Sequence, residues 1–288
     1  MKLYRDFSTQ EEIDEQYNAG ASIPISEREG HIERYIADSK AARENLECEL
    51  DIPYGPTLDE NLDVFPSATP GSPILLFIHG GYWRARSSKD FSFITSAFVA
   101  QGVTVVVNNY ALCPEVSIAE ITRQNRATVA WLAKHADAYN GDANKIYISG
   151  HSAGGHLTAM VCSTNWREQY GLDANLVKGG IPISGIFDLQ PLRYSYLQPV
   201  LQISDELIRQ QSPCYCIPDK GPPLIVSVGE NESAEFHRQA TEHHEAWRQQ
   251  GGQSQLRVEA KDDHFSILYT LADENSSFFA DIMRMLKA

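Results

Sequence analysis

Residues 145–157 read KIYISGHSAGGHL, an apolar run that ends in a Gly-x-Ser-x-Gly motif and continues into a helical pattern. A serine at so sharp a strand-to-helix turn has a strained backbone, and small residues two positions away on either side prevent neighbouring atoms from colliding. The turn exposes the serine oxygen at the positive end of the helix. The motif therefore predicts that Ser152 is a nucleophile, in preference to a glycine-rich turn that only ends a strand.

The chain around this motif alternates short apolar runs with longer helical patterns. Such alternation is typical of a mostly parallel sheet with helices on both faces, so the sequence predicts an α/β protein. We expect one domain over residues 1–288, with residues 1–50 as a helical accessory segment. Residues 189–219 contain several prolines and no strand pattern, which is compatible with a small lid or side wall. The expected strands are 47–52, 61–65, 74–78, 103–107, 145–149, 177–183, 224–228 and 255–260, and the expected helices are 91–101, 118–138, 155–163, 234–250 and 276–286.

A second motif, HGGYW at residues 79–83, directly follows another apolar run. Acyl transfer needs backbone N–H donors aimed at the developing oxyanion, and consecutive glycines let the backbone come close enough to supply them. Gly80 and Gly81 are the candidate donors, with the N–H of Ala153 as a third. We expect the histidine that opens the motif to hold the loop in shape. Tyr82 and Trp83 either pack as ordinary aromatics or line an aromatic substrate pocket.

A nucleophilic serine needs a base, and in folds that carry this serine motif the chain order is serine, acid, histidine. Four histidines lie after about residue 220, where this chain order requires the base. His237, His243 and His244 lie in a long polar helical pattern, where a solvated surface histidine is the usual outcome. His264 instead follows the last predicted strand, in a loop just before a helix. The sequence therefore predicts that His264 is the base.

The acid should lie in the loop after residues 224–228, where a carboxylate can fix the tautomer of the histidine and stabilise the imidazolium. Glu230, Glu232 and Glu235 are all within reach, and their spacing does not choose among them. Asp262 and Asp263 adjoin the predicted base, but the acid normally comes from the end of the preceding strand. We therefore expect both aspartates to be solvated charges.

Taken together, these motifs resemble the kynurenine formamidase (arylformamidase) group of α/β-hydrolases, which is related to the hormone-sensitive-lipase-like esterases. The resemblance rests on residues 79–83, 150–157, 232–236 and 263–265. It implies the α/β-hydrolase fold and places the acid at Glu232. Many members of the group have aspartate at that point, so the glutamate is a departure, although glutamate is a known variant in such triads.

The resemblance implies hydrolysis of an N-formyl arylamine such as N-formylkynurenine to formate and the free amine. A carboxylesterase or amidase that acts on other small acyl substrates is the alternative, because its chemistry is identical. A third hypothesis is a non-catalytic binding protein on a hydrolase scaffold. Such receptors usually lose the serine or the histidine, whereas this chain keeps every candidate member, which favours an enzyme.

The expected partner is the small-molecule amide or ester substrate, and the composition argues against two other classes of partner. The formal net charge is −14 and no basic cluster occurs, which argues against nucleic acid or an anionic membrane. The first fourteen residues lack the apolar core of a signal peptide, and no apolar stretch reaches membrane-spanning length, so a cytoplasmic location is expected. The five irregularly spaced cysteines are expected to be reduced, and the mechanism requires no metal or cofactor. Related hydrolases often dimerise, so a homodimer is compatible with the resemblance.

Overall fold

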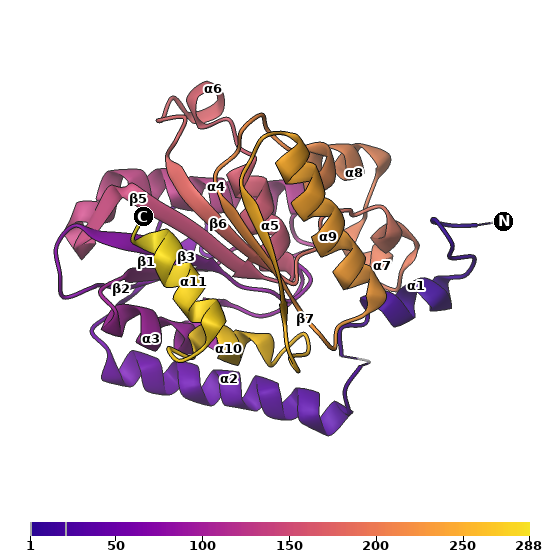
Figure 1. The fold of residues 1–288 in the computed structure, drawn as a ribbon, viewed down its shortest axis with the longest axis horizontal. Helices are drawn as coiled ribbons and strands as arrows, with labels where there is room; N and C mark the ends of the chain where they lie inside the picture. Colours follow the sequence, from indigo (N-terminus) through magenta and orange to yellow (C-terminus); the bar gives the residue numbers. More distant parts are fainter. Residues whose placement is uncertain (1, 21) are drawn as a thin grey trace.

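A computed structural model describes residues 2–20 and 22–288, and in them the strands form one eight-stranded sheet (Figure 1). The strand order is β1-β2-β4-β3-β5-β6-β7-β8. The pairs β1·β2 and β2·β4 are antiparallel, and every other pair is parallel. The predicted mostly parallel α/β sheet is confirmed. The strands are β1 Glu49–Pro53, β2 Asn61–Phe65, β3 Ser72–Ile78, β4 Thr104–Asn108, β5 Gly141–His151, β6 Val177–Ile183, β7 Leu224–Gly229 and β8 Ser254–Glu259.

The apolar residues of the central strands are divided between two cores, one on each face of the sheet. Successive side chains of a strand point to opposite faces. In β3, Ile74 and Leu76 therefore lie in one apolar cluster, whereas Leu75 and Phe77 lie in the other. Because both faces are covered, the central strands are apolar throughout instead of alternating with polar residues.

The helices form a layer on each face (Figure 1). The cluster that includes Ile74 also contains residues of α1, α4, α5, α8 and α9, and the cluster that includes Leu75 contains residues of α2, α3, α10 and α11. No helix in the described part of the chain is long and apolar enough to cross a membrane. The α-helices are α1 Gln10–Tyr17, α2 Ile25–Asn45, α3 Thr95–Ala100, α4 Ile118–His135, α5 Ala153–Cys162, α6 Trp166–Tyr170, α7 Gln198–Leu201, α8 Asp205–Gln211, α9 Ala234–Gln249, α10 Ile267–Ala272 and α11 Ser277–Leu286.

One expected helix differs from the sequence prediction, and two irregular segments are now defined. The helix expected over residues 91–101 is shorter, because 3₁₀ turns precede α3 and the N–H of Phe93 donates to Ser39 Oγ of α2. Residues 189–219 contain no strand, as expected, and fold into α7, α8 and short 3₁₀ turns. In the N-terminal segment, α1 packs against α9, and α2 packs against the 3₁₀ turns before α3. Each of the five cysteines, all within the described residues, is a free thiol.

Candidate active site

Ser152 occupies the turn between β5 and α5, with φ 57° and ψ −117°. Its own N–H donates to the carbonyl of Ile183 in the neighbouring strand at 2.8 Å. A Cβ atom on Gly150 would lie 2.3 Å from the carbonyl oxygen of Gly154, and one on Gly154 would lie 2.0 Å from that of Ile78. Both glycines are therefore required before the strained turn can form.

Glu232 and His264 meet at the end of the sheet where β7 and β8 finish. Glu232 Oε2 lies 2.6 Å from His264 Nδ1, and both side chains are almost fully buried. The other carboxylate oxygen accepts hydrogen bonds from the N–H of Gly229 at 2.8 Å and from Ser184 Oγ at 2.5 Å. These donors fix the carboxylate, which in turn fixes the orientation of the imidazole and leaves its Nε2 atom for proton exchange.

The imidazole of His264 is held by aromatic rings on several sides. Its ring centroid lies 4.8 Å from that of Phe236, 5.7 Å from that of Phe265 and 4.6 Å from that of His151. Burial and the neighbouring His264 lower the pKa of His151 well below its usual range, so His151 is neutral here. His151 therefore adds no positive charge beside the imidazole of His264.

Ser152 and His264 line the same cavity, but no hydrogen bond joins them among the described residues. In unliganded hydrolases this contact is often long and tightens when substrate binds.

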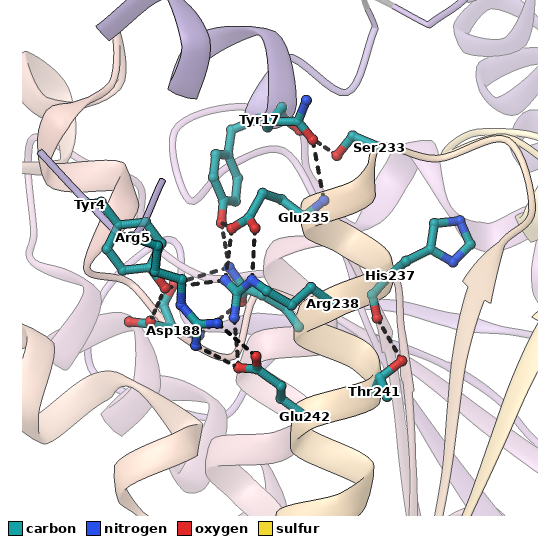
Figure 2. Close-up of polar contacts among 12 residues, drawn as sticks. Tyr4, Arg5, Tyr17, Asp188, Ser233, Glu235, His237, Arg238, Thr241 and Glu242 are labelled. Atoms are coloured by element: carbon teal, nitrogen blue, oxygen red, sulfur yellow. Dashed lines mark hydrogen bonds and ion pairs between the residues drawn. The ribbon is translucent and has the colours of Figure 1, made fainter. Parts of the chain in front are cut away.

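The other two candidate acids have different partners. Glu230 is exposed and accepts a hydrogen bond from the N–H of Lys261 at 2.8 Å. Glu235 accepts a hydrogen bond from the hydroxyl of Tyr17 at 2.6 Å and pairs with Arg238 at 2.7 Å (Figure 2). Of the three glutamates that spacing left open, only Glu232 contacts the imidazole in the described structure.

The glycine loop brings its backbone against the serine. A Cβ atom on Gly80 would lie 3.1 Å from Ser152 Cβ, and Gly81 has φ +110°, a conformation that favours glycine. The N–H groups of Gly80, Gly81 and Ala153 have no acceptor among the described residues. Gly80 and Gly81 line the cavity that contains Ser152, and Ala153 directly follows that serine, so unpaired donors are available there for an oxyanion.

The three side chains of the HGGYW motif that carry rings lie in different places. His79 is buried and stacks on Tyr110 with ring centroids 4.1 Å apart, and burial lowers its pKa to about 4. Tyr82 lines the cavity, and its hydroxyl donates to the carbonyl of Tyr17. Trp83 is fully buried and packs edge-on against His156, outside the cavity lining. Of the two aromatics proposed for substrate contact, Tyr82 alone reaches the cavity.

The cavity around Ser152 has a volume of about 440 Å³, within the range of small-molecule sites. Larger hollows of about 990 and 620 Å³ occur elsewhere, but Ser152 is part of neither. Besides the residues already named, the lining includes Asn18, Ala19, Gly20, Arg28, Glu29, Tyr35, Arg84, Arg86, Phe91 and Tyr196. Sequence reasoning missed these residues because several lie in the N-terminal segment, where no local motif marks them.

The N-terminal segment is fastened to α9 by a network of polar contacts (Figure 2). Ser233 Oγ donates to the carbonyl of Gln16 at 2.6 Å, and Tyr17 bonds both Glu235 and Gln239. Ser233 directly follows the acid in the sequence. The network therefore holds the chain of residues 16–19 beside the candidate acid and base.

Comparison with known protein families shows which family the chain belongs to. A family model described as BD-FAE matches residues 62–246, more than half of the chain, and the match includes Ser152 and Glu232. The chain belongs to the BD-FAE family.

Relatives of this BD-FAE chain include formamidases and esterases. Kynurenine formamidase of Danio rerio is 30% identical over 289 residues, covering 96% of this chain and 97% of the relative. Esterase LipQ of Mycobacterium tuberculosis is 29% identical, covering 63% of this chain and 48% of LipQ. A crystal structure of a candidate thioesterase from a Silicibacter species has a TM-score of 0.84 and 27% identity, covering 96% and 99% of the two chains. This BD-FAE chain is therefore a hydrolase with the α/β-hydrolase fold, similar to kynurenine formamidases.

Three residues expected to be solvated are buried, which corrects the sequence analysis. His243 is 1% exposed and stacks flat on Phe187 with ring centroids 4.2 Å apart. The apolar residues 236, 240 and 247 of α9 face the core at helical spacing, and position 243 falls on the same stripe. Asp262 and Asp263 are also buried, because the chain turns sharply into α10 there. Asp263 accepts hydrogen bonds from the N–H groups of the two residues after His264, which shapes the loop that carries the base.

One group of potential metal ligands lies beside this loop in the described chain. The ligand atoms of Glu27, His31 and Asp263 lie within 4.8 Å of one another. His31 Nε2 is 3.7 Å from Asp263 Oδ2, the spacing of a weak ion pair if the histidine is protonated. None of the three is a member of the Ser152, Glu232 and His264 arrangement, although Asp263 shapes the loop that holds His264.

Proposed function

We propose that this chain is a serine hydrolase that cleaves N-formyl arylamines such as N-formylkynurenine to formate and the free amine. The observation that carries the proposal is the buried contact between Glu232 and His264, on the cavity that also contains Ser152. The curated relative that matches nearly the full chain is named kynurenine formamidase, and this supports the formamide substrate.

The proposed reaction has two halves. His264 takes the hydroxyl proton of Ser152 as the serine oxygen attacks the formyl carbon, and Glu232 stabilises the resulting imidazolium. The N–H groups of Gly80, Gly81 and Ala153 bind the oxyanion of the tetrahedral intermediate. His264 then gives its proton to the leaving arylamine. Water hydrolyses the formyl-serine with the same base, releasing formate and restoring the serine.

The cavity lining suits an aryl group. Apart from the loop glycines and the catalytic side chains, it is rich in aromatic rings that can stack on or pack edge-on against an arylamine. These rings are Tyr35, Tyr82, Phe91, Tyr196 and Phe265.

The test is release of kynurenine from N-formylkynurenine by the purified protein, followed by absorbance, with the S152A variant as the control. We expect turnover by the natural protein and a loss of at least about 10³-fold in the variant. Efficient cleavage of short p-nitrophenyl esters without release of kynurenine would refute the formamide substrate.

Carboxylesterase activity is the second candidate, supported by the likeness to esterase LipQ. It predicts the opposite ranking of the two substrate types in the same assay. A fluorophosphonate probe separates both activities from a non-catalytic receptor, because only a reactive serine is labelled. Absence of labelling at Ser152 would favour the receptor.

A further inference from the structure

The charged residues that line the active-site cavity are unbalanced in sign. Among the described residues, Arg28, Arg84 and Arg86 line it, and Glu29 is the one carboxylate of the lining. The chain as a whole has a formal net charge of −14. Three arginines around one cavity therefore differ in charge from the acidic surface that the composition predicts on average.

Two of these arginines have no acidic partner. Neither Arg28 nor Arg84 makes an ion pair or a side-chain hydrogen bond within the described residues, whereas Arg86 lies 4.0 Å from Asp90. Arg123, by contrast, forms ion pairs with both Glu60 and Glu120. Unpaired guanidinium groups in a cavity can receive a ligand without first breaking an internal contact.

Tyr196 lines the same cavity as these two arginines and contacts one of them. The guanidinium of Arg84 lies over the ring of Tyr196, 5.6 Å from its centroid. Burial raises the pKa of Tyr196; the charge of Arg84 and, more weakly, that of Arg28 oppose the rise, while Asp14, which accepts a hydrogen bond from the N–H of Tyr196 at 2.8 Å, adds to it. Its hydroxyl stays protonated at neutral pH and has no partner among the described residues.

From this arrangement we infer that Arg28, Arg84 and Tyr196 form a subsite for a carboxylate on the leaving group of the substrate. Guanidinium forks bind carboxylates through paired hydrogen bonds, and the phenol adds a third donor. The subsite consists of other residues than the proposed oxyanion donors Gly80, Gly81 and Ala153. The inference rests on the proposed hydrolytic function and names the class of substrate as an aryl amide or ester whose leaving group carries a carboxylate.

The test compares substrates that have the same scissile bond and differ in whether the leaving group carries a carboxylate. One pair is N-formylkynurenine and 2-formamidoacetophenone, which lacks the amino acid group. The other is 3-acetoxybenzoate and phenyl acetate, which reports on the subsite even if formamides are not cleaved. The measured quantity is the ratio of kcat/KM for the charged member to that for the neutral member.

We expect this ratio to exceed 1 in the natural protein and to fall about 10- to 100-fold in R84Q, mainly through KM, because a hydrogen-bonded charge is lost. R84K should restore part of the ratio. R167Q is the matched control, because Arg167 is an exposed arginine on α6 outside the cavity lining, and it should keep the ratio.

Two results would overturn the subsite. One is a natural protein that shows no preference for the charged member of either pair. The other is an R84Q variant whose ratio stays within about twofold of that of R167Q. Failure of the formamide pair alone, with a ratio in the ester pair that depends on Arg84, would instead refute the formamide substrate and leave the carboxylate subsite in place.

Discussion

His243 should make the protein sensitive to acid, and replacing it with leucine should remove that sensitivity. The imidazole is fully buried against Phe187, and neither ring nitrogen has a hydrogen-bond partner in the described chain. Burial, with a smaller contribution from the neighbouring His244, lowers the pKa of His243 from 6.5 to about 3. Between these two pH values the imidazole therefore binds a proton in the unfolded chain but stays neutral in the folded protein.

The size of the effect follows from this difference in pKa. Above pH 6.5 the side chain is neutral in both states and costs nothing in protonation. Between pH 6.5 and about 3 only the unfolded state binds the proton, so the free energy of unfolding decreases as the pH falls. At about 1.4 kcal/mol per pH unit, the loss at pH 5 is about 2 kcal/mol. Leucine has a similar volume and takes up no proton, so H243L avoids this loss.

The assay is urea unfolding of H243L and the natural protein at pH 7 and pH 5, followed by tryptophan fluorescence. Trp247 lies 5.6 Å from the histidine ring and reports locally. We expect the stability difference between the two proteins to grow by about 2 kcal/mol from pH 7 to pH 5. A difference in packing between histidine and leucine changes the stability equally at both pH values. The other buried histidines change the stability of both proteins equally, so both effects cancel in this comparison.

H244L is the matched control on the same helix. His244 is only partly buried, and its Nδ1 atom lies 2.9 Å from Ser254 Oγ, so its pH-dependent increment should be smaller. A stability difference for H243L that is equal at the two pH values, within about 0.5 kcal/mol, would refute the assignment of a neutral, unpaired imidazole to this position.

Three further substitutions test the site and the N-terminal segment. E232Q should lower kcat by about 10³- to 10⁴-fold with the fold intact, because the amide no longer stabilises the imidazolium; near-normal kcat would exclude Glu232 as the acid. G30A should raise the thermal midpoint by about 2 °C, because Gly30 is an exposed residue within α2 and its Cβ would meet nothing within 4 Å; a lower midpoint would contradict this. Y17F should cost about 1–3 kcal/mol in urea unfolding, because Glu235 and Gln239 lose a buried partner; unchanged stability would mean that the network of Figure 2 contributes little.

Local chemistry explains why the serine turn could be predicted from sequence. The glycines at 150 and 154 are required by contacts within a few residues or with one adjacent strand, so the requirement is visible in the motif itself. The place of His264 also followed from chain order, because β7 and β8 pair in parallel and their following loops meet at one edge of the sheet. The choice among three nearby glutamates did not follow, because it depends on the donors Gly229 and Ser184, and the latter comes from another part of the chain.

Side-chain direction in irregular segments was the harder problem. Tyr82 and Trp83 are neighbours with positive φ values of 50° and 55°. Tyr82 lines the cavity and Trp83 does not, and no helix or strand periodicity describes the side-chain directions of such a loop. His243, by contrast, could have been placed. Its spacing of 7 and 4 residues from the apolar positions 236 and 247 marks the buried stripe of α9, and only the polar character of histidine concealed it.

Some residues of the cavity lie inside the part of the chain that matches the BD-FAE family and others lie outside it, and this difference bears on the choice of substrate. The BD-FAE match begins at residue 62, so it includes the serine turn and the oxyanion loop but not Asn18, Ala19 or Arg28, which line the cavity. A formamidase and an esterase need the same nucleophile, base and oxyanion donors, so these groups cannot set the preference between them. The relative named kynurenine formamidase matches 96% of this chain, whereas esterase LipQ matches 63%. We therefore expect the preference for an aryl formamide to depend on the N-terminal segment, which the network on α9 holds beside the proposed acid and base, Glu232 and His264.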